Sequence, residues 1–490
     1  MTAPTALHSV AWFPTVDGGW QTWANYDGPR HSEGMGAARR LGFNCIRTFL
    51  AARTGAFSVP EPMAFELARL TDFCQRGQAA GLQLHLSLFD MQPNIGCLAA
   101  SKKWAEAVIS AIPDTSVLAV IEIKNELPYA LTVPYSGGFD AGWPVGAPRA
   151  EAGRVARAWA VQMIPFIRML APGVPVTASA TGKPSGHLTA LVAATKGTEA
   201  EPDWYEWHCY DPPGWVNAEL QEAIAVAGGP SMLRLGETGY EVTAAGTQGP
   251  AQIQQAQADY LQANRWYCCQ LGLGEPSPWM LADLEPCDQF PSGSAYGLLD
   301  GPGNPRLAAK MYERYPPGTQ VPPVALNGNM RGTPHADADG NLLPPRWCLY
   351  RGQTGAQPIS ATVDTSTLCG GHPSILLTGS AATRTSDNQP ALEADPLSPV
   401  ICAGRQYAFS CSLKGSGSCG TPSFAVAWYG QRGRWISSAN GPPLTIAGSF
   451  VRYSLTAAAP RGALYARLFV RTGGNAGSIW AAGASWEPAP

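Results

Sequence analysis

The stretch Val117-Leu-Ala-Val-Ile-Glu-Ile-Lys-Asn-Glu126 begins as a dense apolar run and ends in polar residues. Such a run of β-branched and other apolar residues, without strict alternation, is typical of a parallel strand that is covered on both faces. Similar runs recur along the chain up to residue 282. They predict eight strands, over Ser9–Phe13, Phe43–Leu50, Leu82–Phe89, Val117–Ile123, Val174–Ser179, Trp204–Tyr210, Met232–Gly236 and Pro278–Ala282.

Helical patterns separate these strands. An apolar stripe runs from Met63 to Cys74 at helical spacing, and further patterns cover Ala251–Leu271 and Pro305–Tyr315. Eight strand–helix units predict a TIM (β/α)8 barrel, whose active site lies at the carboxyl ends of the strands. The alternative is a doubly wound sheet. That fold usually has a glycine-rich phosphate loop after its first strand, and Phe13-Pro-Thr-Val-Asp-Gly-Gly19 does not have the spacing of such a loop.

The remaining sequence changes character. Between residues 316 and 345, turn residues such as Pro322-Pro323 and Asn327-Gly328 dominate and no periodicity persists, which predicts a linker. After it, short alternating runs separated by Gly, Ser and Pro predict an all-β sandwich. A chain of 490 residues is also too long for one hydrophobic core of ordinary size. We therefore expect a barrel over 1–315, a linker over 316–345 and a sandwich over 346–490.

Composition narrows the class of ligand. Only 14% of the residues are charged and the net charge is −3, without a long run of either sign, which disfavours nucleic acid as a partner. The apolar runs are far shorter than the roughly eighteen residues of a membrane span, so no membrane insertion is expected. The chain has 16 Trp, which either fill a large core or stack on a neutral ligand such as a sugar ring. The oligomeric state stays open.

Two of the predicted strands end in a glutamate. Glu126 follows the fourth strand, and Glu237 follows the seventh in Leu233-Arg-Leu-Gly-Glu-Thr-Gly239. Both side chains would project into the mouth of a barrel, where two carboxyls can act as acid and nucleophile on a glycosidic bond. A single glutamate at such a position is more often a helix-cap partner or a solvated loop residue. The prediction of a glycosidase site therefore rests on Glu126 and Glu237 occurring together, after strands four and seven.

The order of several motifs resembles that of glycoside hydrolase clan A, and within it the family 5-like enzymes, over residues 8–315. The matching pieces are Leu41-Gly-Phe-Asn-Cys-Ile-Arg47, Asn125-Glu126, His208-Cys-Tyr210, Gly236-Glu237, Trp279 and Tyr296-Gly-Leu-Leu-Asp-Gly301. The resemblance implies that Glu126 is the general acid/base and Glu237 the nucleophile. It implies further roles for five residues: Asn125 at the sugar 2-hydroxyl, Arg47 and Tyr210 at Glu237, His208 lining the site, and Trp279 as a stacking floor.

One loop departs from the family pattern. The sequence after the third strand reads Leu88-Phe-Asp90-Met-Gln-Pro93 and lacks the His-rich or Trp-rich signature of the family. The sugar that the site binds therefore stays open. Five tryptophans near strand ends are candidates for further sugar subsites: Trp20, Trp23, Trp143, Trp207 and Trp215.

These roles imply a retaining β-glycoside hydrolase that acts on a polysaccharide or oligosaccharide by double displacement, without a required cofactor or a metal. Burial and the charge of Glu237 would raise the pKa of Glu126, so that it stays protonated. Arg47 could instead form only a core ion pair with Glu122, and His208 could be a buried structural histidine.

Two other functions remain open. The chain could be a non-catalytic glycan-binding or adhesion protein that uses the barrel cleft only for binding, or a virion-associated depolymerase of a cell-surface polysaccharide. The first residues lack the cationic and apolar regions of a secretory signal peptide. A polysaccharide substrate nevertheless favours an extracellular site of action, either secreted or on a virion.

The C-terminal third resembles the jelly-roll carbohydrate-binding modules that are often joined to such enzymes, in Gln406–Lys414, Ala425–Tyr429 and Ala459–Leu468. Alternate strand positions face the core of a sandwich, so each aromatic residue here is either a sugar platform or a core residue. The candidates are Trp428, Tyr429, Trp435, Trp480 and Trp486. Such modules often hold a structural calcium, although the sequence shows no clear ligand loop. Five cysteines in this part leave disulfides open as well.

Overall fold

The computed structural model describes residues 6–16, 19, 21–51, 57–58, 61–90, 98–127, 149–211, 213–242, 250–287, 290, 292–324, 326–330, 334–336, 340–350, 359–379, 390–394, 396–417, 419–430, 433–473 and 477–490. Its internal contacts divide the chain into two compact units. The first comprises Met1–Tyr210, Glu219–Glu241 and Tyr267–Val321, and the second comprises Asp211–Ala218, Val242–Trp266 and Pro322–Pro490.

The first unit is built on a seven-stranded parallel sheet whose strands lie in chain order. The strands are β1 (Ser9–Ala11), β2 (Cys45–Ala51), β3 (Gln83–Asp90), β4 (Leu118–Glu122), β5 (Val176–Thr181), β6 (Trp204–His208) and β7 (Leu233–Glu237). Nearly all of their residues are buried, as expected for strands covered on both faces. Because the strand order never reverses, the sheet is not doubly wound.

Residues 277–282 close this sheet into a TIM barrel. The N–H of Ser277 donates to the Leu235 carbonyl of β7 at 3.0 Å, and the N–H of Leu281 donates to the Ala11 carbonyl of β1 at 2.9 Å. The predicted barrel is thus confirmed. The predicted strand Pro278–Ala282 is wrong as a continuous strand, since in this described segment its two end residues form isolated bridges. A proline has no N–H to donate to a ladder, which limits the pairing.

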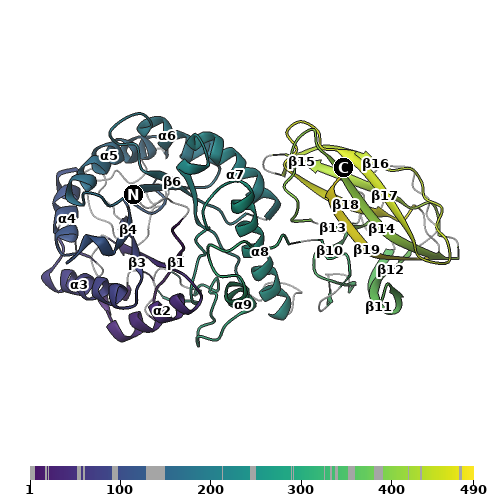
Figure 1. Ribbon diagram of the computed structural model, residues 1–490, viewed down its shortest axis with the longest axis horizontal. Coiled ribbons are helices and arrows are strands. Elements are labelled where there is room, and N and C mark those ends of the chain that lie inside the picture. The colour runs from purple at the N-terminus through teal and green to yellow at the C-terminus, as the bar shows by residue number, and fades with distance from the viewer. Residues whose placement is uncertain are drawn as a thin grey trace. The chain divides into compact units, whose positions relative to one another are not determined.

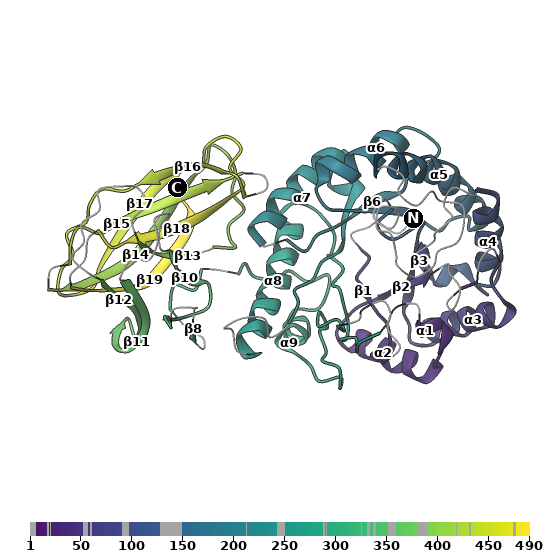
Figure 2. The same ribbon diagram turned by 180° about the vertical axis from the view of Figure 1, so that it is seen from behind.

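Helices surround the strands of the first unit, as Figures 1 and 2 show for α2 to α6. The helices of the chain are α1 (Gln21–Ala24), α2 (Gly28–Arg40), α3 (Ala64–Ala79), α4 (Leu98–Ser110), α5 (Arg149–Leu170), α6 (Thr189–Thr195), α7 (Pro213–Ala227), α8 (Pro250–Gln270) and α9 (Leu307–Arg314). The patterns predicted near residues 251–271 and 305–315 correspond to α8 and α9. The stripe predicted from Met63 begins one residue too early, because Met63 is the exposed N-cap of α3.

The second unit contains the predicted all-β domain, a sandwich of two sheets. One sheet has the strand order β10-β13-β18-β15-β16, and the other β17-β14-β19-β12-β11-β9-β8. The strands are β8 (His335–Ala336), β9 (Leu342–Leu343), β10 (Trp347–Tyr350), β11 (Ile359–Cys369), β12 (His372–Gly379), β13 (Ala391–Ala394), β14 (Gln406–Ser416), β15 (Ser423–Tyr429), β16 (Trp435–Asn440), β17 (Val451–Ala458), β18 (Tyr465–Arg471) and β19 (Ser478–Pro488). β8, β9 and the core residue Met330 lie within 316–345, so part of the predicted linker belongs to the sandwich.

The sandwich core divides the five aromatic candidates. Trp428 and Trp486 pack in the core and are 1% and 7% exposed, so these two are core residues and not sugar platforms. Trp435 is 59% exposed on β16, and Tyr429 and Trp480 are half-buried. Because Trp428 and Trp486 are core residues, only Trp435, Tyr429 and Trp480 remain of the five candidate platforms.

The cysteines at positions 369, 402, 411 and 419 of the sandwich are free thiols.

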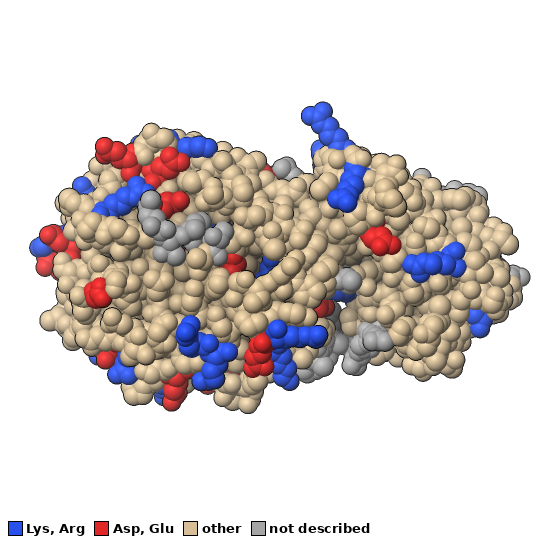
Figure 3. Space-filling model, in the orientation of Figure 1, with Lys and Arg blue, Asp and Glu red and all other residues tan. Residues whose placement is uncertain are grey.

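Charged residues make up only 14% of the sequence. On the face that Figure 3 shows, Lys and Arg are scattered and mixed with Asp and Glu rather than gathered in a basic stripe. The exclusion of nucleic acid stays a prediction. None of the helices that the structure describes is both long and apolar enough to cross a membrane.

Candidate active site

The ends of β4 and β7 bring Glu126 and Glu237 together. A carboxylate oxygen of each, and a ring nitrogen of His208, all lie within 4.8 Å of one another. Glu237 is the last residue of β7 and is 6% exposed, whereas Glu126 lies in the turn after β4 with 18% of its side chain exposed. The two glutamates predicted from the strand ends therefore meet in one place.

Local backbone geometry fixes both glutamates. Glu126 has a φ of 46°, in the left-handed region that costs a non-glycine residue about 1–3 kcal/mol. Its N–H donates to the Ser179 hydroxyl at 2.7 Å, which ties the turn to β5. Before Glu237, a Cβ at Gly236 would come within 2.2 Å of the Glu206 carboxylate. Glycine is therefore needed for β7 to pass this side chain.

Two donors hold Glu237. Nη1 of Arg47 donates to its Oε2, and the hydroxyl of Tyr210 donates to its Oε1. Burial lowers the pKa of Arg47, but the charges of Glu122 and Glu237 outweigh burial and raise it. Burial and the charge of Glu237 raise the pKa of Tyr210 well above its usual value. Tyr210 is 38% exposed as a residue, yet its hydroxyl is held against Glu237, so both donors keep their protons and stabilise a carboxylate.

Arg47 also reaches other residues of β4 and its turn. Its Nη2 donates to Glu122 Oε2 at 3.0 Å and to Asn125 Oδ1 at 2.9 Å. A core ion pair with Glu122 and a role at Glu237 were alternatives from the sequence, and the structure contains both contacts at once. The contact of Asn125 with the sugar 2-hydroxyl stays a prediction.

His208 is buried between the two carboxylates. Its Nδ1 lies 3.1 Å from Glu126 Oε1 and 3.6 Å from Glu237 Oε2. Burial lowers the pKa of His208, but the charge of Glu237 and the hydrogen bond with Glu126 outweigh burial and raise it. Burial raises the pKa of Glu126, but the hydrogen bond with His208 and the histidine's charge outweigh burial and lower it. The expectation of a raised pKa for Glu126 is therefore wrong, because the contact with His208 lowers it.

Trp279 lies among aromatic side chains. Its ring centroid is 5.9 Å from that of Phe13 and 5.8 Å from that of Phe49. A Cβ at Gly239 would come within 2.4 Å of the Trp279 carbonyl and 3.3 Å of the Tyr210 ring, so this glycine lets the two segments approach. Trp279 is half-buried, and its use as a stacking floor stays a prediction.

Two of the tryptophans predicted as subsites are core residues instead. Trp23 and Trp207 are fully buried, and Trp207 Nε1 donates to the Gly182 carbonyl at 2.8 Å. Trp215 lies in the second unit, where its Nε1 donates to the Tyr465 hydroxyl at 2.9 Å. Trp20 and Trp143 lie outside the described residues.

Three residues of this region were not predicted as site residues. Asp90 ends β3 and is 5% exposed; burial raises the pKa of its carboxyl to about 6, although the charge of Lys124 opposes this. Lys124 is fully buried and donates to the Asn125 carbonyl at 3.0 Å, and burial lowers its pKa. Tyr296 lies with its ring 5.6 Å from that of Tyr210. For Asp90 and Lys124 the available signal was a charged residue at the end of an apolar strand.

The cluster of Glu126, His208 and Glu237 could also bind a metal ion. Glu126, His208 and Glu237 have the donor types and the spacing of a metal site. Arg47 and Tyr210 each already donate to an oxygen of Glu237, which is the arrangement of a stabilised carboxylate rather than of a vacant ligand.

Within the described part of 346–490, no three His, Cys, Asp or Glu side chains come as close to one another as those of the barrel cluster. Since calcium also accepts carbonyl oxygens, the structural calcium there stays a prediction.

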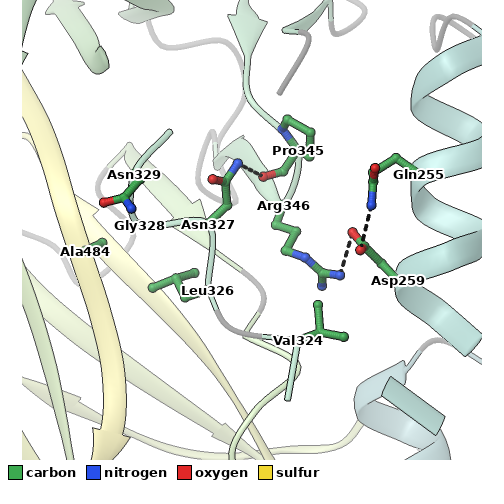
Figure 4. Close-up of a pocket in the computed structure, with 10 residues that line it drawn as sticks. All are labelled: Gln255, Asp259, Val324, Leu326, Asn327, Gly328, Asn329, Pro345, Arg346 and Ala484. Atoms are coloured by element: carbon green, nitrogen blue, oxygen red, sulfur yellow. Dashed lines mark hydrogen bonds and ion pairs between the residues drawn. The ribbon is translucent and has the colours of Figure 1, made fainter. Parts of the chain in front are cut away.

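A cavity of about 420 Å³ in the second unit is a different kind of pocket (Figure 4). Its described lining consists of Gln255, Asp259, Val324, Leu326, Asn327, Gly328, Asn329, Pro345, Arg346 and Ala484. Arg346 Nη2 lies 2.8 Å from Asp259 Oδ2, and Asn327 donates to the Pro345 carbonyl at 3.0 Å. The one carboxylate of this lining is therefore already paired, and the cavity lacks the two adjacent carboxyls that the barrel provides.

No protein-family model and no curated protein matches the chain. Among solved structures, it is similar to an exo-β-1,4-mannosidase from an Opitutaceae bacterium, at 18% identity and a TM-score of 0.48, over 62% of this chain and 58% of the mannosidase. It is also similar to the GH5_18 enzyme of Streptomyces cattleya (15% identity, TM-score 0.47, over 63% of this chain and 79% of that one). It is similar as well to a β-glucuronidase of Bacteroides uniformis, at 11% identity and a TM-score of 0.46, over 99% of this chain and 66% of the glucuronidase.

Proposed function

We propose that the chain is a retaining β-glycoside hydrolase in which Glu237 attacks the anomeric carbon and Glu126 is the acid/base. The observation that carries this is the contrast between two adjacent carboxyls. Glu237 accepts from a guanidinium and a phenol, whereas Glu126 shares a proton with His208. Retaining enzymes hold their carboxyls about 5–5.5 Å apart and inverting enzymes about 6.5–9.5 Å, so an approach of the two oxygens to within 4.8 Å supports retention.

In this mechanism His208 supplies the proton. As the bond from Glu237 to the anomeric carbon forms, Glu237 loses the negative charge that raises the pKa of His208. The proton then moves from Nδ1 of His208 to Glu126, and from Glu126 to the leaving oxygen as the glycosidic bond breaks. In the second half, water attacks the glycosyl ester, its proton returns through Glu126 to His208, and Glu237 is released as a carboxylate.

We further propose a polysaccharide or oligosaccharide substrate and an extracellular site of action. Asn125 would bind the sugar 2-hydroxyl and Trp279 would stack on a ring. In the sandwich, the exposed indole of Trp435 would make a second contact with glycan by stacking on a sugar ring.

The test is hydrolysis of a panel of 4-nitrophenyl β-glycosides and polysaccharides, with product sizing and NMR of the first anomer formed. We expect a β-anomer first, and losses of at least about 10³-fold in kcat for Glu126→Gln and Glu237→Gln on unactivated substrates. Full activity in either variant would sink the assignment, and a first-formed α-anomer would sink retention alone. Binding of a glycan without turnover would favour the adhesion alternative, whereas turnover confined to a cell-surface polysaccharide would favour the depolymerase.

A further inference from the structure

A layer of charged side chains lies inside the barrel beneath the proposed site. It consists of Arg47, His85, Glu122, Glu206 and Arg234, from β2, β3, β4, β6 and β7, and all five are fully buried. Burying a charge costs several kcal/mol unless a partner compensates it. The contacts within this layer should therefore show what each charge does.

Glu122 is the residue of this layer that bears on the nucleophile. Its Oε2 accepts from two nitrogens of Arg47, Nε at 3.3 Å and Nη2 at 3.0 Å. A guanidinium is planar, so holding the edge formed by these two nitrogens fixes the direction of the third. That third nitrogen, Nη1, donates to Glu237. The ring of Phe49 lies 4.4 Å from the guanidinium carbon and restricts it further.

Glu122 is in turn fixed from the far side. Nε2 of His85 lies 3.4 Å from Glu122 Oε2, and Nδ1 of His85 lies 4.0 Å from Glu206 Oε1. Glu206 is paired with Arg234 at 3.3 Å and accepts from Trp204. Carboxylates therefore alternate with guanidinium and imidazole side chains from Arg234 to Glu237, with Glu122 and Arg47 as the last two before Glu237.

We propose that Glu122 is a positioning residue that acts on Glu237 through Arg47: it aims one guanidinium N–H at the nucleophile and offsets part of the positive charge that the nucleophile experiences. This rests on the proposed role of Glu237. Arg47 is shared between two carboxylates, so it can orient Glu237 without binding it as tightly as an unshared guanidinium would. A nucleophile held less tightly leaves its partner more readily as the bond to the anomeric carbon forms.

The charge of Glu122 makes this testable by pH. The charged or titratable groups facing Glu122 are Arg47, His85, Lys124, His208, Glu206 and Asp90. Those facing Glu237 are Arg47, His208, Tyr210, Tyr296 and Glu126. Removing one negative charge disfavours the protonated form of the titratable groups around it. In Glu122→Gln, both limbs of the pH profile of kcat/KM should therefore move to lower pH, by about one unit, and kcat should fall about tenfold with KM nearly unchanged.

The experiment measures full pH profiles on the 4-nitrophenyl β-glycoside that the wild-type chain hydrolyses fastest. The matched control is Glu206→Gln, at an equally buried carboxylate that accepts from Trp204 and Arg234. This substitution should move the limbs far less. Glu122→Asp keeps the charge but withdraws it by one methylene, so kcat should fall while the limbs stay in place. If Glu122→Gln does not fold, Glu122→Asp still tests the positioning role of Glu122.

The outcomes separate the two proposals. If Glu237→Gln keeps full activity, the hydrolase mechanism itself fails. If Glu237 is required but the profile of Glu122→Gln superimposes on that of Glu206→Gln, the hydrolase stands and the role of Glu122 is overturned. Limbs that shift in Glu122→Asp as far as in Glu122→Gln would overturn it as well, because they would show that position rather than charge moves them.

Discussion

Replacing Asp90 by asparagine measures by how much a buried carboxylate beside the site lowers the free energy of unfolding. Asp90 is 5% exposed, and burial raises the pKa of its carboxyl from 3.8 to about 6. The native state therefore binds this proton more tightly than the unfolded chain does, so stability falls as pH rises from 3.8 to 6. A shift of about two pKa units corresponds to about 3 kcal/mol once the carboxyl is fully ionised.

Asp90→Asn removes this cost and keeps the shape of the side chain. Relative to the wild type, the variant should gain about 1.5 kcal/mol at pH 5 and about 3 kcal/mol at pH 7 and above. The measurement is denaturant unfolding at several pH values from about 5 to 8, with the midpoint and slope fitted for each protein. Glu33→Gln on the exposed side of α2 is the control, and its effect should not change over this range. A stability difference for Asp90→Asn that stays constant between pH 5 and 7 would refute the reasoning.

Three further predictions concern the site. Tyr210→Phe removes a donor to ionised Glu237, so the acid limb of kcat/KM should move up by about one pH unit; an unmoved limb contradicts the contact. Trp279→Ala should raise KM about tenfold with little change in kcat, since ring stacking contributes about 0.5–1.5 kcal/mol; an unchanged KM excludes Trp279 as a floor. Dialysis against EDTA should leave hydrolysis unchanged, whereas a loss reversed by added Zn²⁺ or Mn²⁺ would assign Glu126, His208 and Glu237 to a metal.

The position of the two glutamates was predictable because of how parallel strands are arranged. The carboxyl ends of barrel strands share one face, so a glutamate after the fourth strand and another at the end of the seventh had to approach each other. The sequence, through its family resemblance, placed Arg47 at Glu237 and also offered Glu122 as a partner. It could not decide between them, because only a closed barrel shows that one guanidinium spans both carboxylates.

The protonation of the site was not predictable in this way. Glu126 and His208 are separated by 82 positions in the chain, and their contact at 3.1 Å depends on how the turn after β4 is held by Ser179. With that contact, the histidine lowers the pKa of Glu126 that burial alone would raise. A pKa is set by the nearest charges, and these come from strands whose exact approach no local pattern contains.

The charged residues that interrupt the apolar strands are the more informative part of the sequence. Glu122 and Glu206 each stand between apolar neighbours at positions that a barrel interior would normally fill with aliphatic side chains. An unpaired charge there would cost several kcal/mol, so such residues persist only if partners from adjacent strands compensate them. In this chain the partners are Arg47 and Arg234, and the series of contacts ends at Glu237. A charged residue inside an apolar strand thus marks a layer that must be paired. Chemistry should be sought where the contacts of that layer reach the carboxyl ends of the strands.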